Sequence, residues 1–335
     1  MTSFSQGLVE VKAKLNGQAF SYFVMDPGNN VKGILLLFPG KGESAESVFN
    51  KTPLPYELSR EGFMTIVPDL PYSLIADEFT RKAINQILIS QISKHEHVKP
   101  NLVLGGFSAG GTLAISLAEY YLKTDSNSTV RGVFAIDPPL DFTRLYASAE
   151  NKMRYNCQSL VKKEGKMMID YFNQTAGGPP NSKSEEYLKL SPFSANDSNG
   201  GNAKYLENIP VRLYAEPDLD FVKRFYCKEL QFSDLNAFDL EKLNKILFVN
   251  GNSTCEYITT RGKGYHTWNI LDTGDAVEWI KRICRSSVKY EEVIAKAFRQ
   301  IKYIPIAIGM CLNFSNNPAL LNSNFSANSQ KKHEH

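Results

Sequence analysis

The chain has 335 residues, of which 42% are hydrophobic, and a formal net charge of +3 at pH 7. A chain of this length can bury a large core, either as one α/β domain with an insertion or as two smaller domains. The small net charge excludes the strongly basic classes that bind nucleic acid or anionic membranes through bulk charge. No stretch approaches the roughly 18 apolar residues of a membrane span. The N-terminus shows no secretion signal, so we expect a cytoplasmic location.

The five cysteines are scattered along the chain and form no Cys-x-x-Cys spacing. This pattern is not typical of a disulfide framework or of a metal site. We therefore expect no disulfide framework, no metal and no organic cofactor. The cysteines are Cys157, Cys227, Cys255, Cys284 and Cys311.

The first hundred residues predict strands that alternate with helices. Apolar and polar residues alternate on both sides of Asn16-Gly17, a strong signal of a β-hairpin. A near-continuous apolar run then predicts a strand that is buried on both faces. In chain order we expect a hairpin over 8–25, a strand over 31–38, a helix from Ser44 to about Arg60, a strand over 64–68 and an amphipathic helix from Asp77 to about His95.

The most informative stretch spans residues 100–118. A buried strand over 102–104 precedes Gly-Phe-Ser-Ala-Gly at 106–110, and a helix-period pattern starts at Thr112. Gly-x-Ser-x-Gly between a strand and a helix is typical of a sharp turn that lifts the serine above the sheet edge. The glycines are needed because side chains there would collide with the strand or the helix. We therefore predict Ser108 to be a nucleophile.

The second half of the chain predicts more strands, separated by a long helical insertion. A strand over 130–136 ends at Asp137, and no clear parallel strand follows before residue 208. We interpret residues 138–208 as a helical insertion that caps the site. After it we expect strands over 210–215 and 255–260, helices over 221–230, 240–245 and 275–283, a helix from 286 to about 304, and an Asn- and Ser-rich tail to residue 335.

This order of elements predicts the fold class. Strands alternating with helices favour an α/β fold with a mostly parallel central sheet and helices on both faces. The insertion after the sixth strand would then be a cap. We expect residues 1–285 to form one domain, with 286–335 as a C-terminal helix and tail. In such a sheet the site lies beyond the carboxyl ends of the strands, where Ser108 lies.

Ser108 needs a base, and the base needs an acid that orients it. Among five histidines, only His266 sits in a Gly-containing loop after a predicted strand. The acid should follow a strand between the serine and the histidine. Asp218 is preferred because it lies nearest the end of the 210–215 strand. Asp220 and Asp137 remain alternatives, Asp137 because it ends the strand after the serine.

Together these residues make the chain similar to the α/β-hydrolase family over about residues 15–285. The chain order Ser108, Asp218, His266 is that of the family. Residues 38–42, Phe-Pro-Gly-Lys-Gly, stand where the family commonly has His-Gly. The resemblance implies an oxyanion hole made by the backbone N–H groups of Lys41 and Ala109. It implies acyl transfer to water through an acyl-enzyme.

The leading interpretation is thus a serine hydrolase that cleaves a carboxylic ester of a small-molecule substrate. A peptidase or amidase of the same fold is the first alternative. A binding protein that kept the fold without catalysis is the second, because fold alone does not imply function. The sequence indicates no nucleic-acid partner, and it does not specify the acyl group, the leaving group or the oligomeric state.

Overall fold

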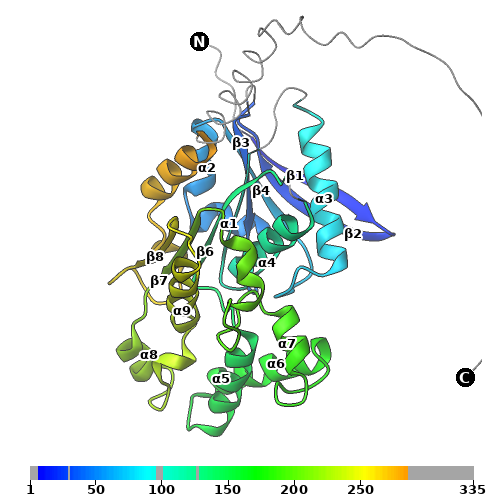
Figure 1. The fold of residues 1–335 in the computed structure, drawn as a ribbon. Coiled ribbons are helices and arrows are strands. Elements are labelled where there is room, and N and C mark those ends of the chain that lie inside the picture. The colour runs from blue at the N-terminus through cyan, green and yellow to red at the C-terminus, as the bar shows by residue number, and fades with distance from the viewer. Residues whose placement is uncertain (1–6, 29–30, 96–100, 126–127, 286–335) are drawn as a thin grey trace, which may run out of the picture. The chain divides into compact units, whose positions relative to one another are not determined.

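The computed structural model describes residues 7–28, 31–95, 101–125 and 128–285. Eight strands form one sheet in the order β1-β2-β4-β3-β5-β6-β7-β8 (Figure 1). The strands are β1 (Leu8–Leu15), β2 (Gln18–Met25), β3 (Gly33–Phe38), β4 (Phe63–Asp69), β5 (Leu102–Phe107), β6 (Val130–Ile136), β7 (Val211–Ala215) and β8 (Cys255–Thr259). The helix expected after residue 286 and the expected tail lie outside the described residues.

The sheet is mostly parallel, as the sequence predicts. Only β1 with β2 and β2 with β4 pair antiparallel, and the predicted hairpin turns at Asn16-Gly17. All other neighbouring strands pair parallel. In the register, Phe107 lies opposite Ile136, and Ile136 lies opposite Tyr214. The residues that follow β5, β6 and β7 therefore emerge side by side at one edge of the sheet.

Helices cover both faces of the sheet, and the central strands are buried on both faces. Along β3, Ile34 and Leu36 belong to one core cluster, while Leu35 and Leu37 belong to the other. This alternation is the two-residue period of a strand. The first face carries α3 (Glu78–Ile92), α4 (Ala109–Thr124) and α9 (Asn236–Val249). The second carries α1 (Ala45–Lys51), α2 (Leu54–Arg60), η3 (Trp268–Ile270) and a helix over 273–285.

One expected helix is divided in two. Ser44 caps α1 as predicted, its side chain accepting from the N–H of Ser47. The helix does not run on to Arg60, because Pro53 has no N–H to continue it. The N–H of Thr52 closes α1 on the carbonyl of Val48, and α2 starts afresh after Pro53.

A helical cap follows β6, in agreement with the predicted insertion. It comprises α5 (Phe142–Arg154), α6 (Ser159–Thr175), α7 (Ser184–Leu190) and the short η1 (Gly201–Leu206). Aromatic rings hold the first three helices together, with Phe172 between Phe142 and Tyr187. Figure 1 shows α5, α6 and α7 gathered with α8 (Leu219–Phe225) at one end of the sheet. No helix among the described residues is long and apolar enough to cross a membrane.

A disulfide between Cys157 and Cys227 corrects the expectation that the cysteines form no such bond. The two residues are 70 positions apart and show no motif spacing, so only the fold brings them together. Cys157 lies between α5 and α6, and Cys227 follows α8. Next to the bond, Gln158 donates from its N–H to the carbonyl of Tyr226 at 3.4 Å and from its side chain to the carbonyl of Phe225 at 2.8 Å. The cap is thus fastened to the α8 segment.

Removing this disulfide is expected to destabilise the fold. Closing a 70-residue loop in the unfolded chain corresponds to about 4 kcal/mol in the chain-entropy model. We expect the paired replacement Cys157→Ser and Cys227→Ser to lower the free energy of unfolding in guanidinium by about this amount. The control is reductant, which should lower the stability of the wild type to that of the variant and leave the variant unchanged. Equal wild-type stability with and without reductant would contradict the bond.

Candidate active site

Ser108 stands at a sharp turn between a strand and a helix. β5 ends at Phe107 and α4 begins at Ala109, three residues earlier than the predicted start at Thr112. Ser108 has φ 52° and ψ −122°, a conformation that residues other than glycine rarely adopt. Its N–H donates to the carbonyl of Ile136 at 2.8 Å, which fixes the turn to the end of β6.

The glycines on either side of Ser108 leave no room for a side chain. A Cβ at Gly106 would lie 2.4 Å from the backbone of Gly110, and one at Gly110 would lie 2.3 Å from the carbonyl oxygen of Phe38. Backbone atoms cannot yield to such contacts. The sequence-based explanation for the two glycines is therefore confirmed.

His266 is held by a carboxylate from another strand end. Its Nδ1 lies 2.5 Å from Oδ2 of Asp137, the first residue after β6. The Asp137 side chain is buried, and the imidazole is one-third exposed. His266 also packs on Phe107, with ring centroids 4.7 Å apart, and Phe107 is the residue directly before Ser108. Acid, imidazole and serine turn thus lie at the edge where β5 and β6 end.

Three of the four non-glycine residues with positive φ in the described parts of the chain are Ser108, Asp137 and His266, with φ of 52°, 47° and 54°. The fourth, Asn16, lies in the hairpin turn. Each such residue costs about 1–3 kcal/mol and persists only where the surrounding structure enforces it, and such residues cluster at functional sites. The backbone strain of this structure is thus concentrated on three residues whose side chains belong to one site.

The structure does not place Asp218 in the site, so the preference for Asp218 as the acid is corrected. Its carboxylate accepts from the N–H of Phe221 at 2.8 Å and caps α8, which starts directly after it. Asp218 and Asp220 are both exposed, whereas Asp137 is 3% exposed and bonded to His266. The alternative Asp137 is therefore the aspartate that contacts His266.

The backbone around Asp137 is fixed by hydrogen bonds to neighbouring elements. Its N–H donates to the carbonyl of Tyr214 on β7 at 2.7 Å, and its carbonyl accepts from the Asn236 side chain of α9 at 3.0 Å. The next two residues are prolines, which have no N–H to satisfy. The carbonyl of Pro139 accepts from the Thr112 hydroxyl at 2.8 Å. These bonds hold the strained turn in place.

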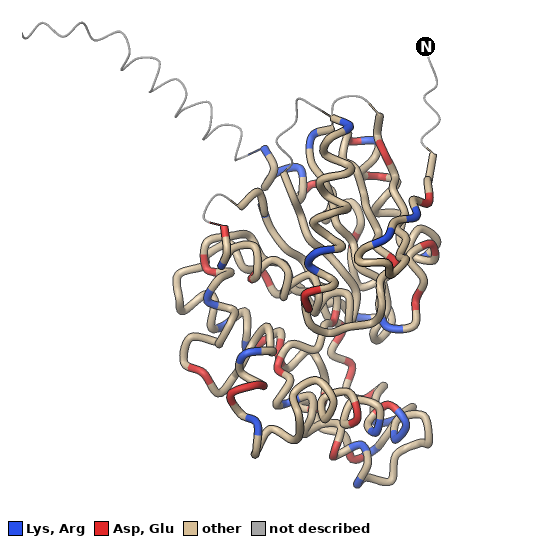
Figure 2. The backbone as a smooth tube through the Cα atoms, turned by 90° about the vertical axis from the view of Figure 1, so that its right-hand side faces the viewer, with Lys and Arg blue, Asp and Glu red and all other residues tan. Residues whose placement is uncertain are grey.

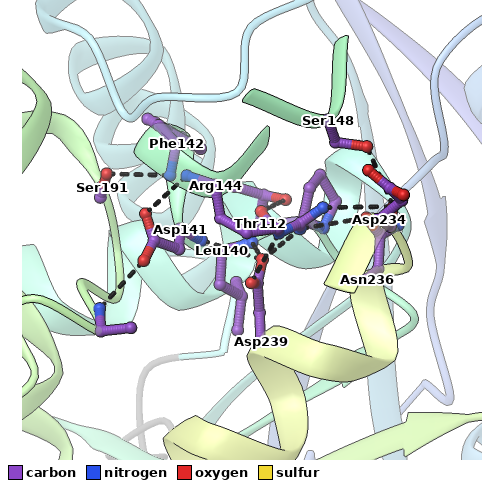
Figure 3. Close-up of polar contacts among 12 residues, drawn as sticks. Thr112, Leu140, Asp141, Phe142, Arg144, Ser148, Ser191, Asp234, Asn236 and Asp239 are labelled. Atoms are coloured by element: carbon purple, nitrogen blue, oxygen red, sulfur yellow. Dashed lines mark hydrogen bonds and ion pairs between the residues drawn. The ribbon is translucent and has the colours of Figure 1, made fainter. Parts of the chain in front are cut away.

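A buried ion pair anchors the remainder of this loop, as Figure 3 shows. Asp239 on α9 accepts from the N–H groups of Leu140 and Asp141 at 2.9 and 3.0 Å. The same carboxylate binds the Arg144 guanidinium through both of its oxygens, with 2.8 Å between Nε and Oδ1. Burial lowers the pKa of Arg144, but the charge and hydrogen bonds of Asp239 outweigh burial and raise it. No sequence motif marks Asp239, which is 98 residues from Asp141.

Glu216 holds the backbone of the loop that carries His266. It follows β7, one residue from the strand end, and its carboxylate accepts from the N–H groups of Lys263 and Gly264 at 2.8 and 3.1 Å. The Thr260 hydroxyl donates to it at 2.9 Å. Burial raises the pKa of Glu216, but these donors outweigh burial and bring it below its ordinary value. The carboxylate nearest the end of β7 thus supports the histidine loop and does not contact the imidazole.

Glu43 joins the loop after β3 to the histidine loop. Its Oε2 accepts from the N–H of Gly40 at 2.7 Å and from the indole N–H of Trp268 at 3.1 Å. Lys51 on α1 neutralises it, with Nζ 2.6 Å from Oε1. Trp268 lies two residues beyond His266. Glu43 therefore sets the spacing between the two loops, a role for which the sequence carries no signal beyond its position after Gly42.

The two predicted oxyanion donors belong to the same region as Ser108. Lys41 and Ala109 both line the cavity into which Ser108 opens. Ala109 is the first residue of α4, where backbone N–H groups have no partner within the helix. The neighbouring N–H of Gly40 is already bonded to Glu43, so that group is not available to a ligand. This arrangement can accept an anionic oxygen.

Ser108 and His266 open into one cavity of about 600 Å³, within the usual range for small-molecule sites. The cap supplies much of its wall, as the sequence predicts. The lining residues include Tyr72, Leu74, Phe107, Pro139, Leu145, Lys152, Val161, Glu164, Met168, Val222, Leu230, Asn236 and Tyr265. The cavity is thus bounded by the strand ends on one side and by α5, α6 and α8 on the other.

The electrostatics favour protonation of His266. Burial lowers the pKa of this imidazole, but the hydrogen bond and negative charge of Asp137 outweigh burial and raise it. Glu164, across the cavity, adds to the rise. An imidazolium formed next to Asp137 would therefore be stabilised. Such stabilisation is what a base that takes a proton from Ser108 requires.

Comparison with known proteins finds similar structures but no similar sequences. No protein-family model matches the sequence, and no curated protein matches it. Among solved structures, carboxyl esterase 2 of the mycorrhizal fungus Tuber melanosporum superposes with a TM-score of 0.55 at 18% identity, covering 85% of this chain and 88% of that one. EstE1, a thermostable carboxylesterase cloned from a metagenomic library, gives 0.53 at 18% identity, covering 84% and 88%. A lipase in its open form gives 0.52 at 14% identity, covering 83% and 99%.

The three likenesses extend over most of each chain. Each superposition covers more than four-fifths of both chains. At such low identity the likeness concerns the fold. Together with the strand order, the turn at Ser108 and the helical cap after β6, it shows that the chain has the α/β-hydrolase fold.

Proposed function

We propose that the protein is a serine hydrolase that cleaves a carboxylic ester through Ser108, His266 and Asp137. The observation that carries the proposal is the 2.5 Å bond between Asp137 and His266 beside a serine at φ 52°. The solved structures with the same fold include carboxylesterases and a lipase, and this supports an ester as the substrate. A cavity of about 600 Å³ accommodates a small molecule.

The proposed reaction starts with attack of the Ser108 hydroxyl oxygen on the ester carbonyl. Asp137 accepts the Nδ1–H of His266, so Nε2 carries the free lone pair and takes the serine proton. The resulting imidazolium gives this proton to the leaving alcohol, and an acyl-enzyme remains. Water, activated by the same imidazole, then releases the acid and restores Ser108.

The negative charge that develops on the carbonyl oxygen needs donors that are already in place. The N–H groups of Lys41 and Ala109 are proposed to supply them, as the fold resemblance implies. One such donor is worth roughly 3 kcal/mol, or about a hundredfold in rate. Glu43 would keep the Lys41 loop at the correct distance because it bonds both Gly40 and Trp268.

A fluorophosphonate probe tests the proposal, because it reacts only with an activated serine. We expect stoichiometric labelling of the native protein, mapped by mass spectrometry to the peptide that contains Ser108. Heat-denatured protein and the Ser108→Ala variant should not react. The matched control is Ser116→Ala on the same helix, α4, which should label like the wild type. A folded wild-type protein that remains unlabelled would support the binding-protein alternative.

A further inference from the structure

A second hollow of about 430 Å³ adjoins the cavity that contains Ser108. The two share part of their lining, namely Lys41, Tyr72, Lys163, Met167 and Met168. The second hollow adds residues of α6, among them Lys166, Asp170 and Gln174. A molecule bound at Ser108 could therefore extend past Lys41 into this hollow without leaving the protein surface.

The charges around the shared lining are mostly positive. Three lysines line the second hollow, and its one carboxylate, Asp170, is paired with Lys166 at 2.6 Å. Lys41 and Lys163 have no ion pair within the parts of the chain that the structure describes. Neither lysine therefore forms an ion pair where the two hollows meet, although the charge of Glu164 acts on Lys41 and offsets part of the lowering of its pKa by burial.

The carboxylates of the main cavity are already engaged. Glu164 lies 3.1 Å from Lys152. Burial raises the pKa of Glu164, but Lys152, with smaller effects of His266 and Lys41, outweighs burial and lowers it. Asp234 accepts from the N–H of Gln231 at 2.8 Å and from Asn151 at 3.1 Å. Neither carboxylate therefore forms an ion pair with Lys41 or Lys163, and Glu164, whose charge acts on Lys41, is already paired with Lys152.

Lys41 is held where a ligand would meet it. Its ammonium lies 5.3 Å from the ring centroid of Tyr72, within the range of a cation–π contact. Partial burial lowers the pKa of Lys41, so the ammonium has lost some of its hydration. Burial raises the pKa of Tyr72, so that hydroxyl stays neutral and adds no counter-charge. A bound anion would replace the lost hydration of Lys41.

The excess of positive charge is local to the lining that the two hollows share. Figure 2 shows basic and acidic residues interspersed over the described chain, without one block of a single sign. One part of the wall of the main cavity is apolar, formed by Leu74, Leu145, Val161, Met168, Val222 and Leu230. The continuous space therefore has an apolar part and a cationic part.

We propose that the substrate is an amphiphilic ester whose apolar chain lies along the apolar wall and whose anionic group, a carboxylate or a phosphate, binds Lys41 and Lys163. The claim that the ligand is an ester rests on the proposed function, whereas binding of the anionic group does not require catalysis. An exposed or half-exposed ion pair contributes about threefold in affinity, so two lysines give about tenfold.

Binding to the Ser108→Ala variant tests the anion site without turnover. Titration calorimetry should compare monooctyl succinate with its neutral methyl ester, and octyl phosphate should serve as the phosphate probe. We expect about tenfold tighter binding of the anion, reduced about threefold by adding Lys163→Gln and reduced again by salt. The matched control is Lys162→Gln, the neighbour on α6 that lines neither hollow. Which of the two anions binds more tightly identifies the group.

Hydrolysis of the two succinate esters by the wild type separates this inference from the proposed function. Anion-selective binding without hydrolysis of either ester would leave the anion site standing and overturn the hydrolase. Hydrolysis of both esters with equal KM, or equal binding of both, would overturn the anion site. A preference for the anion that Lys163→Gln does not reduce would also overturn it.

Discussion

Replacement of Ser108 by alanine is expected to lower kcat on p-nitrophenyl butyrate by about 10⁶-fold. This is the size of loss seen when the serine of such a triad is removed. Alanine cannot form the acyl-enzyme, and only the oxyanion donors and the binding cavity would remain to catalyse direct attack by water. The measurement is the initial rate at saturating ester, followed by absorbance of the released nitrophenolate.

The loss counts for the proposal only if the variant is folded. Circular dichroism and the free energy of unfolding in guanidinium should match the wild type, because alanine is smaller and removes no side-chain hydrogen bond that caps α4. Ser116→Ala, on the outward part of the same helix, should keep full activity. A Ser108→Ala protein with undiminished rate would refute the assignment of the nucleophile.

Replacement of Asp137 by asparagine is expected to lower kcat about 10⁴-fold, as at other triad acids. The neutral amide can donate to Nδ1, which would leave the proton on Nε2, the wrong nitrogen for a base. Asp137 also raises the pKa of His266. Its loss should therefore move the ascending limb of kcat/KM against pH to lower pH, because the imidazole is neutral over a wider range.

The matched control for this prediction is Asp218→Asn. Its carboxylate caps α8 and is exposed, so we expect nearly unchanged kcat and an unchanged pH profile, with a stability cost of at most about 1 kcal/mol. The two variants carry the same chemical change at two strand ends. A larger loss of activity at Asp218 than at Asp137 would restore the sequence-based choice of acid.

The sequence was sufficient for the fold because its signals are local. Asn16-Gly17 between alternating residues, the apolar runs at 33–38 and 102–107, and the glycines around Ser108 each dictate backbone geometry over a few positions. The parallel sheet, the cap after β6 and the strand-end position of Ser108 follow from their order. His266 was identified for the same kind of reason, as the one histidine in a loop after a strand.

The acid could not be chosen from the sequence because Asp137 and Asp218 both follow strands. The two residues differ in backbone conformation. Asp137 takes φ 47° at a turn, whereas Asp218 is the residue that caps the start of α8. Two adjacent prolines made Asp137 resemble an ordinary turn residue. The carboxylate directly after β7 is that of Glu216, and it accepts hydrogen bonds from backbone N–H groups of the loop that carries His266.

The residues that hold the site in place were also invisible in the sequence. Asp239, Asn236 and Glu43 act through contacts with residues up to 225 positions away. Their partners are mostly backbone groups, which have no sequence signature. Such contacts follow from the assembled sheet and cannot be inferred from spacing.

The bond between Cys157 and Cys227 has a practical consequence for how the protein is produced. Cytosolic thiol buffers keep most cysteine pairs reduced, and stable pairs are typical of oxidising compartments. The bond is therefore expected to form most readily under oxidising conditions. Protein purified from a reducing bacterial cytosol would carry the thiols of Cys157 and Cys227 in addition to those of Cys255 and Cys284, and its cap would lack the covalent link to the α8 segment. Recombinant material should be assayed for free thiols before its activity is compared between preparations, and an oxidising host or periplasmic export is the appropriate source.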